Sequence, residues 1–405
     1  MVNMSQNSSA ASGTPSAPAM VNWELAAKTA ANLAPAGPDL SGSEISAAVE
    51  NLRLMAEKSV PHVHEISRLE AAKDLHDSEV LIVDRASWAK ANTQSFAVMM
   101  DPVLRALAAK QADSAKGSGP TPGSPGAAFS ATVTGAQLGG ALAFLSSKVL
   151  GQYDPFSALG QSDPNAARPN SAHSNAAHSN AAKSGGRLLL VAPNIITVER
   201  DLKVDPADFR LWVCLHEQTH RVQFAAAPWL RHHMIGEIEK LGTLLVGDSE
   251  KFGERLLESA KSLGRKHDST ADSTPESSRG SVLDLLQDPA QKAALSHLTA
   301  VMSLLEGHAN VVMDGVDKSI VPTVRTIRQR FNSRGKDRGV IEKFIRNLMG
   351  LDAKMRQYSD GAKFVRDTVA VVGMDGFNQV WNQVENLPTE AEIHNARLWV
   401  DRMGL

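Results

Sequence analysis

The sequence predicts a mainly α-helical fold with a small β component, an α+β class. Apolar residues recur at helical spacing along most of the chain, and Pro or Gly interrupts the pattern between segments. Two short aliphatic or β-branched runs, Val80–Arg85 and Leu188–Ile196, are typical of strands. Many helices and few strands are therefore expected.

Composition limits the class of protein. The chain has 405 residues, 42% of them hydrophobic, so it can bury a large core, and its length allows two or three domains. The single cysteine, Cys214, excludes an intrachain disulfide and fits a reducing compartment. We expect Cys214 to be a core residue, because it lies on a different helical face from the nearby histidine His216.

Charge and the N-terminus narrow the location and the partners. The formal net charge of −2 provides no global field for nucleic acid or for an anionic membrane surface. The first 20 residues lack the basic and apolar regions of a secretion signal, and no uninterrupted run of 18 apolar residues occurs. We therefore expect a cytoplasmic protein with no nucleic-acid or membrane partner. The oligomeric state is not predicted.

The first third of the chain predicts a tail and several helices. Residues 1–20 are rich in Ser, Ala and Pro and predict a disordered tail. Helices are expected from Asn22 to near Pro35, from Ser41 to about Ser59 with Glu44 completing a capping box, and after Pro61 to Leu69. After the strand at Val80–Arg85, one helix should run from Ala86 to Pro102 and another to Lys110.

The middle of the chain contains two low-complexity stretches. Residues 112–126 are mostly Ser, Gly and Pro and predict a loop. Residues 162–186 contain the repetitive run Ser-Ala-His-Ser-Asn-Ala-Ala-His-Ser-Asn, which predicts an unstructured insertion. Between them, Thr134–Gly151 has apolar residues at helical spacing, with Gly139 and Gly140 permitting close packing. Leu188–Ile196, which Pro193 divides, predicts one or two strands whose edge could align a bound peptide.

The segment Leu211–Phe224 carries the pattern His-Glu-x-x-His as His216, Glu217 and His220. Residues four apart share one helical face, so the two imidazoles can bind one ion. In such an apolar helix the histidines and the carboxylate need a partner, which a metal ion supplies. We predict that His216 and His220 bind Zn²⁺ and that Glu217 is a general base, on a helix capped by Asp205.

A catalytic zinc needs a third protein ligand. The extended motif with a third histidine is excluded, because Gln223 and Ala226 occupy its glycine and histidine positions. His232 and His233 follow a proline and are expected at the surface or in a loop.

Glu306 is the preferred third ligand, in an apolar helix that begins near Ser296. His308 points about 200° away from it on the helix and remains the alternative. Asn310 or Asp314, on the face of Glu306, could accept hydrogen bonds from the ligand histidines. The competing interpretation is a buried carboxylate and histidine satisfied by hydrogen bonds alone.

Two side chains after Gly350 could donate a hydrogen bond to a developing oxyanion. Lys354 and Tyr358 lie on one face of a predicted helix, and we name Tyr358 as the candidate catalytic residue. The alternative is a tyrosine packed in the core with its hydroxyl bonded.

Several blocks resemble an actinobacterial zincin-like family, whose members are labelled zinc-dependent metalloproteases, hydrolases or deazaflavin-cofactor-biosynthesis-associated proteins. The resemblance covers almost the whole chain from Val21 onward. It implies one catalytic unit over residues 21–405, a helical zincin-type core, and Glu306 as third ligand. The blocks are Phe209–Phe224, Pro228–Leu230, Val149–Asp154, Val191–Asn194, Leu305–His308, Gln357–Gly361 and Trp381–Trp399.

The leading functional hypothesis is a zinc metallopeptidase that acts on a peptide or protein substrate. One alternative is a non-catalytic zinc-binding or interaction protein that retains the zincin scaffold, which four protein ligands on the metal would favour. Another is a small-metabolite amide hydrolase, which a deep closed pocket would favour.

Overall fold

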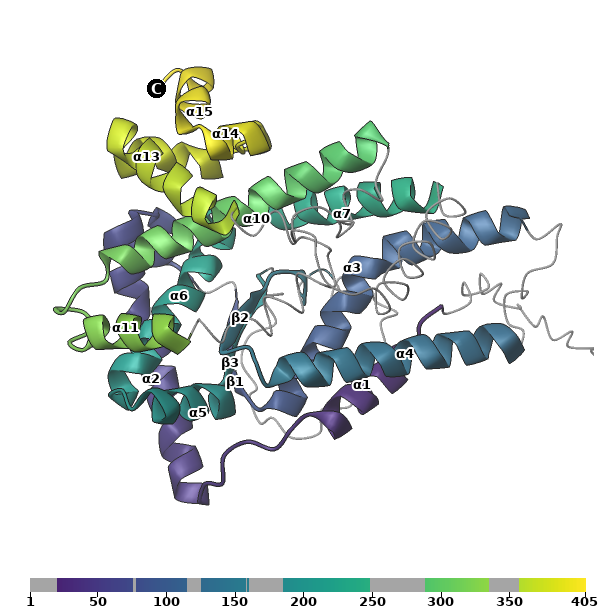
Figure 1. Ribbon diagram of the computed structural model, residues 1–405, viewed down its shortest axis with the longest axis horizontal. Helices are drawn as coiled ribbons and strands as arrows, with labels where there is room; N and C mark the ends of the chain where they lie inside the picture. The colour runs from purple at the N-terminus through teal and green to yellow at the C-terminus, as the bar shows by residue number, and fades with distance from the viewer. Residues whose placement is uncertain are drawn as a thin grey trace, which may run out of the picture.

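The fold is mainly helical, with one small sheet near its centre (Figure 1). The computed structural model describes residues 20–75, 78–114, 125–157, 159, 185–247, 288–334 and 357–405. The predicted fold class is confirmed. The predicted tail and most of the two low-complexity stretches lie outside the described residues.

The sheet has three strands in the order β1–β3–β2. β1 (Glu79–Val83) pairs in parallel with β3 (Arg187–Val191), and β2 (Gly151–Asp154) pairs with β3 in the antiparallel sense. The strand expected at Val80 is confirmed. β2 was not predicted: the helical spacing was followed as far as Gly151, the first residue of β2, whereas the helix α4 (Pro125–Ser146) ends five residues earlier.

The expectation of strands throughout Leu188–Ile196 is wrong in its second half. β3 stops at Val191 and the helix α5 (Ala192–Leu202) begins at once. Pro193 stands in the first turn of α5, where its missing N–H removes no helical hydrogen bond, so the proline starts a helix and does not divide a strand. β3 is the central strand, so its edges cannot align a peptide.

Two prolines that were expected to separate helices lie inside longer ones. α1 (Trp23–Leu33) begins at Asn22 as predicted, and α2 (Gly42–Ser67) has the predicted capping box of Ser41 and Glu44. α2 continues through Pro61, and α3 (Arg85–Ser114) continues through Pro102. In α2 the buried face runs on beyond the proline, and this packing offsets the hydrogen bond that the proline cannot make.

α4 packs against α1 and α3. A Cβ on Gly139 would lie 2.6 Å from the Ala26 carbonyl oxygen, so this glycine allows the close approach that was predicted, whereas Gly140 faces open space. The stretch Ala128–Ser146 is long and apolar enough to cross a membrane by length and composition, with a mean hydropathy of 1.3, and 28% of it is buried. The exclusion of any membrane-spanning segment from composition is therefore too strong.

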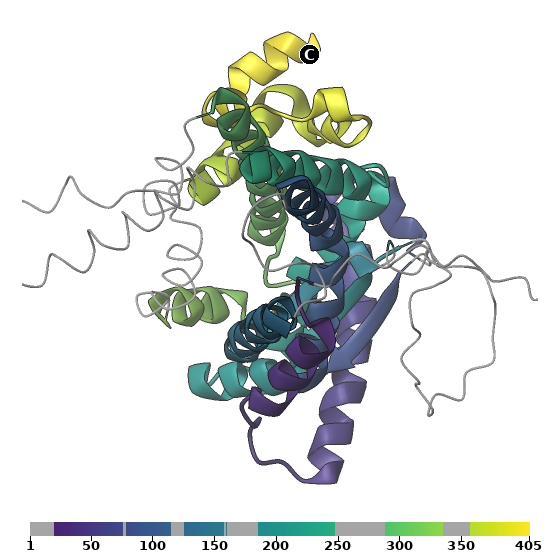
Figure 2. The same cartoon turned by 90° about the vertical axis from the view of Figure 1, so that its right-hand side faces the viewer.

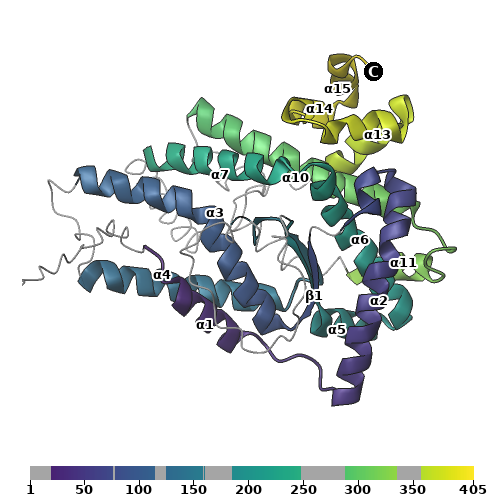
Figure 3. The ribbon, with the colours of Figure 1, turned by 180° about the vertical axis from the view of Figure 1, so that it is seen from behind.

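The core is built around α6 (Pro206–Ala226). α6 packs against α2, β2 and β3, and against α10 (Pro289–Gly315), which also contacts α7 (Leu230–Gly247). Seen from behind, α2 lies alongside α6 with β1 next to it (Figure 3). Most of α6 is buried, including Phe209, Leu215, Val222 and Phe224.

The C-terminal helices form a cap at one end of the molecule (Figure 2). After α11 (Val324–Arg334), the cap comprises α13 (Gln357–Phe377), the 3₁₀ turns η3 (Asn378–Trp381) and η4 (Val384–Asn386), α14 (Glu390–His394) and α15 (Ala396–Met403). An aromatic cluster fills it: the Phe364 ring meets the rings of Phe377 and Trp399 edge-on, and the Trp399 indole donates to the Asn386 carbonyl.

Glycines bring α10 and α13 into backbone contact. A Cβ on Gly307 would lie 2.2 Å from the carbonyl carbon of Gly361, and a Cβ on Gly361 would lie 2.0 Å from the Ser303 carbonyl oxygen. Real Cβ atoms do not approach other atoms so closely, so only glycine fits at either place without moving the helices.

Gly307→Ala should lower the free energy of unfolding by about 1–3 kcal/mol, because the added methyl group overpacks the α10–α13 crossing. Urea denaturation measures the change. Gly236→Ala in α7 is the matched control: its Cβ would meet nothing within 4 Å, so stability should hold or rise by up to about 1 kcal/mol. Equal effects of the two substitutions would contradict the close crossing.

Candidate metal centre

The predicted start of α6 is confirmed. Asp205 caps the helix, since its carboxylate accepts a hydrogen bond from the Asp208 N–H at 3.0 Å, and Pro206 occupies the first turn. The cap therefore determines that α6 begins ten residues before His216.

Two polar side chains next to the histidines anchor α6 to its neighbours. The Gln218 amide donates to the Ala56 carbonyl in α2 at 2.9 Å. The Arg221 guanidinium donates to the Ser78 hydroxyl at 2.6 Å and to the Ser78 carbonyl at 2.8 Å, just before β1. Because both anchors are buried, they hold the helix in one rotation and turn its histidine face toward α10.

The crossing of α6 and α10 brings His216, His220 and Glu306 together. One nitrogen from each histidine and one carboxylate oxygen all lie within 4.8 Å of one another. The Glu306 carboxylate is 4.0 Å from His216 Nε2 and 3.7 Å from His220 Nε2, and the two rings are nearly perpendicular at 88°. Among the residues that the structure describes, this is the one group of three potential metal ligands.

Gln223 determines which nitrogen of His220 faces this group. The Gln223 amide nitrogen lies 2.9 Å from the Leu305 carbonyl oxygen, which can only accept a hydrogen bond. The amide oxygen therefore points the other way, to His220 Nδ1 at 3.0 Å, and that nitrogen must be the donor. His220 Nε2 is left with its lone pair directed toward Glu306.

His308 belongs to the same network and not to the ligand group. Its Nδ1 lies 2.9 Å from the Gln223 amide nitrogen and so accepts the second amide proton. The ring is fully buried between Phe377 and Trp381, and this burial lowers the pKa of His308 to about 3, so the ring is neutral. Its Nε2–H has no hydrogen-bond partner among the described residues.

The acceptors expected for the ligand histidines are wrong. Asn310 is exposed, and Asp314 forms an ion pair with Arg366 at 3.1 Å. For His220 the acceptor is Gln223, three residues later on the same helix. The spacing of three residues could have revealed it, but its contacts with Leu305 and His308 depend on the packing of two distant segments.

The buried side chain of Glu217 packs against β2. A Cβ on Gly151 would lie 2.6 Å from Glu217 Cγ, so the carboxylate occupies space that any other residue at 151 would fill. Burial, reinforced by the charge of Glu306, raises the pKa of Glu217 to about 8. Burial also lowers the pKa of His216 to about 4, which favours the neutral imidazole that binds metal.

The remaining predicted residues lie elsewhere. Cys214 is fully buried, as predicted, and burial raises its thiol pKa. His232 is exposed, while His233 on α7 contacts His297 on α10 with an Nε2–Nε2 distance of 2.7 Å. Tyr358 lies in the first turn of α13, three residues before Gly361, but its side chain and all of Lys354 lie outside the described residues.

A zincin-like metallopeptidase family model matches residues 21–400 of the chain. A crystal structure from Chloroflexus aurantiacus, of a presumed hydrolase with a novel fold, is similar at a TM-score of 0.60 and 26% sequence identity. The similarity covers 95% of this chain and 99% of that one. No curated protein matches the chain.

Two-bond ¹H–¹⁵N NMR spectra of histidine-labelled protein should show His220 as the Nδ1–H tautomer and His308 as the Nε2–H tautomer, because the Leu305 carbonyl fixes the Gln223 amide between them. The exposed His232 provides the reference for a ring that samples both tautomers. An Nδ1–H signal from His308 would mean that the amide is reversed.

Proposed function

Since the chain belongs to the zincin-like metallopeptidase family, we propose that it is a zinc-dependent hydrolase that cleaves amide bonds in peptides. His216, His220 and Glu306 would hold the metal, and Glu217 would act as general base. The single observation that supports this assignment most directly is the convergence of these three ligand atoms within 4.8 Å beside a buried carboxylate.

The donor set fits zinc. Two imidazoles and one carboxylate are a common ligand set of catalytic zinc, and ligands at about 2 Å from the ion stand roughly 3.3 Å apart in a tetrahedron. The separations of 3.7 and 4.0 Å need only a small closing movement. The tautomer of His220, set by Gln223, leaves the correct nitrogen free to bind.

An open coordination position favours catalysis over a structural role. Among the described residues the group offers three ligands, whereas structural zinc sites use four. The side chains of His216 and Glu306 are 30% and 31% exposed, so the side of the group away from the helices is open to a substrate. These features favour an enzyme over the non-catalytic alternative.

A zinc ion bound here would supply Lewis-acid chemistry, which makes water a nucleophile at neutral pH and polarises a carbonyl group. Glu217 would accept the proton of the attacking water on its carboxylate and deliver it to the leaving amine nitrogen.

The substrate proposal rests on β2. β2 is an edge strand, and Gly151 in this strand lies directly against Glu217. An extended peptide that ran along this edge would pass beside the general base, and main-chain hydrogen bonds would align it. We prefer this to a small-metabolite amide, for which a deep closed pocket would be expected.

The proposal also includes an oxyanion donor, a cellular location and a class of partner. We keep Tyr358 as the candidate oxyanion donor, because α13 crosses α10 at Gly307, next to Glu306. A cytoplasmic location, a protein or peptide partner without nucleic acid or membrane, and the link to deazaflavin-cofactor biosynthesis in actinobacteria also remain predictions.

Glu217→Gln should retain the fold and bind zinc while losing hydrolysis by about 10²–10⁴-fold, because the amide cannot accept the proton. A peptide-library cleavage assay and metal analysis of the same preparation measure both properties. Glu239→Gln, an exposed carboxylate on α7, is the matched control and should leave activity unchanged. Hydrolysis that survives in Glu217→Gln would refute the proposed mechanism.

Gln223→Met should weaken zinc binding by roughly 10–100-fold, since the ring of His220 would lose the acceptor that sets its tautomer. Competition with a chelator measures the affinity, and urea denaturation of the apo-protein shows that the variant is folded. Gln137→Met, at an exposed position of α4, should bind zinc like the wild type. Unchanged affinity in Gln223→Met would show that Gln223 does not orient the ligand.

A further inference from the structure

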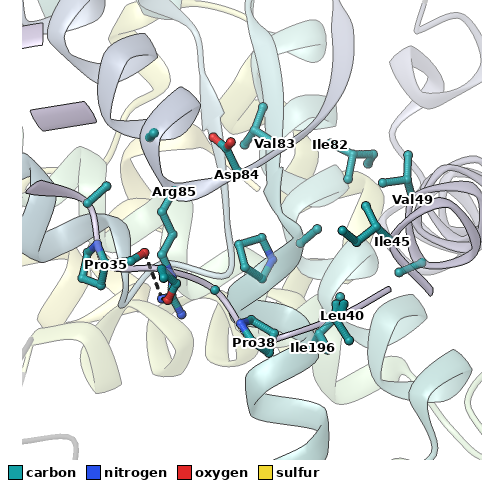
Figure 4. A pocket seen from close by; sticks show the side chains of 17 residues that line it. Pro35, Pro38, Leu40, Ile45, Val49, Ile82, Val83, Asp84, Arg85 and Ile196 are labelled. Carbon is teal, nitrogen blue, oxygen red and sulfur yellow. Dashed lines mark hydrogen bonds between the residues drawn. The ribbon is translucent and has the colours of Figure 1, made fainter. Parts of the chain in front are cut away.

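A cavity lies at the carboxyl ends of the parallel strands β1 and β3, and no residue of the metal centre lines it (Figure 4). Its volume is about 400 Å³, within the range of small-molecule pockets. The walls come from the linker between α1 and α2, from α2, from the end of β1 and from the first turns of α5.

Most of the lining is aliphatic. Figure 4 shows Ile45 and Val49 of α2 on one side, Ile82 and Val83 above, and Leu40 with Ile196 below. Ile45 is 50% exposed although it faces this cavity, so apolar surface is left open to water. An apolar ligand would remove that surface from water.

The polar end of the cavity is formed by Arg85, a cation that has no counter-ion among the described residues. Its guanidinium donates to the Asn194 side-chain oxygen at 2.6 Å, to the Pro35 carbonyl at 3.2 Å and to the Ala36 carbonyl. These acceptors are neutral, and no carboxylate of the described residues forms an ion pair with Arg85. Its Nη2 makes no hydrogen bond to any described residue.

The N-terminus of α5 also favours an anion beside Arg85. α5 starts at the cavity wall, and its N-cap residue Val191 provides no side-chain acceptor for the free N–H groups of the first turn. The one carboxylate in the lining, Asp84, is exposed and accepts a hydrogen bond from the Ser87 N–H at the start of α3. It is therefore occupied as a helix cap.

The cavity is held in shape by the protein itself. Asn194 donates to the carbonyls of Ser146 and Val149, so the acceptor that holds Arg85 is itself fixed. Arg85 holds the linker by its hydrogen bond to the Pro35 carbonyl. At Gly37 the linker approaches α5 so closely that a Cβ on this glycine would lie 2.8 Å from Pro193 Cβ. A ligand would meet a largely preformed site, which reduces the entropy lost on binding.

We propose that this cavity binds a small aliphatic carboxylate, with the hydrocarbon chain against Ile45, Val49 and Ile82 and the carboxylate on Nη2 of Arg85. The ligand would bind independently of the metal centre. A short hydrocarbon chain is favoured over a long one, because the linker forms one wall of the cavity and limits its volume.

Isothermal titration of the full chain with octanoate, octylammonium and acetate tests the chemistry. Octanoate should bind one to one, octylammonium on the order of tenfold or more weaker, and acetate not measurably, since charge and chain both contribute. Titrations are made with zinc-loaded and with metal-stripped protein. Equal binding of octanoate and octylammonium, or octanoate binding only to the zinc-loaded form, would overturn the proposal.

Variants test the location. Ile45→Ser should weaken octanoate binding about tenfold, whereas Leu33→Ser, at a residue that is 60% exposed but does not line the cavity, should leave it unchanged. Arg85→Met should abolish the preference for octanoate over octylammonium. The same affinity in Ile45→Ser and Leu33→Ser would place the binding elsewhere, and so would a preference that persists in Arg85→Met, whose folding is checked by circular dichroism.

Discussion

The hydrogen bond from the Gln223 side chain to the Leu305 carbonyl joins the two helices on which the metal centre depends. It is buried, and it sets the position of α10 along α6, the side on which Glu306 emerges, and the tautomer of His220. A single amide therefore couples the geometry of the site to its protonation state. Burying this amide is not costly, because its oxygen and both of its N–H groups have hydrogen-bond partners.

The parts of the site that depend on one helix could be predicted from the sequence. The spacing of His216 and His220, the cap at Asp205 and the separation of Glu306 from His308 follow from helical geometry alone, and the structure agrees with each. The features that depend on contact between two distant segments could not be predicted in this way. The partners of Gln223 and the place of Gly151 beside Glu217 exist only after α10 and β2 have packed on α6.

The errors in predicting the helices and strands also arose because contacts between distant segments are not visible in the sequence. Proline was interpreted as a break, between helices at Pro61 and within a strand at Pro193, and both interpretations were wrong for opposite reasons. At Pro61 burial on both sides continues the helix, whereas at Pro193 the end of a strand places the residue where a first turn can begin. The class of fold survives such errors because the number of helical segments, rather than their exact ends, determines it.

Gly151 has a consequence for recognising related chains. The space for the general base exists because Gly151 has no side chain, and this glycine lies on a strand that is distant in sequence from the helix that carries the base. A chain with His-Glu-x-x-His but a larger residue at the matching strand position would have to place its carboxylate differently. The informative signature is thus discontinuous: a strand glycine, the histidine helix with a glutamine one turn later, and a glutamate followed by glycine. Each part compensates for the poor specificity of a five-residue pattern.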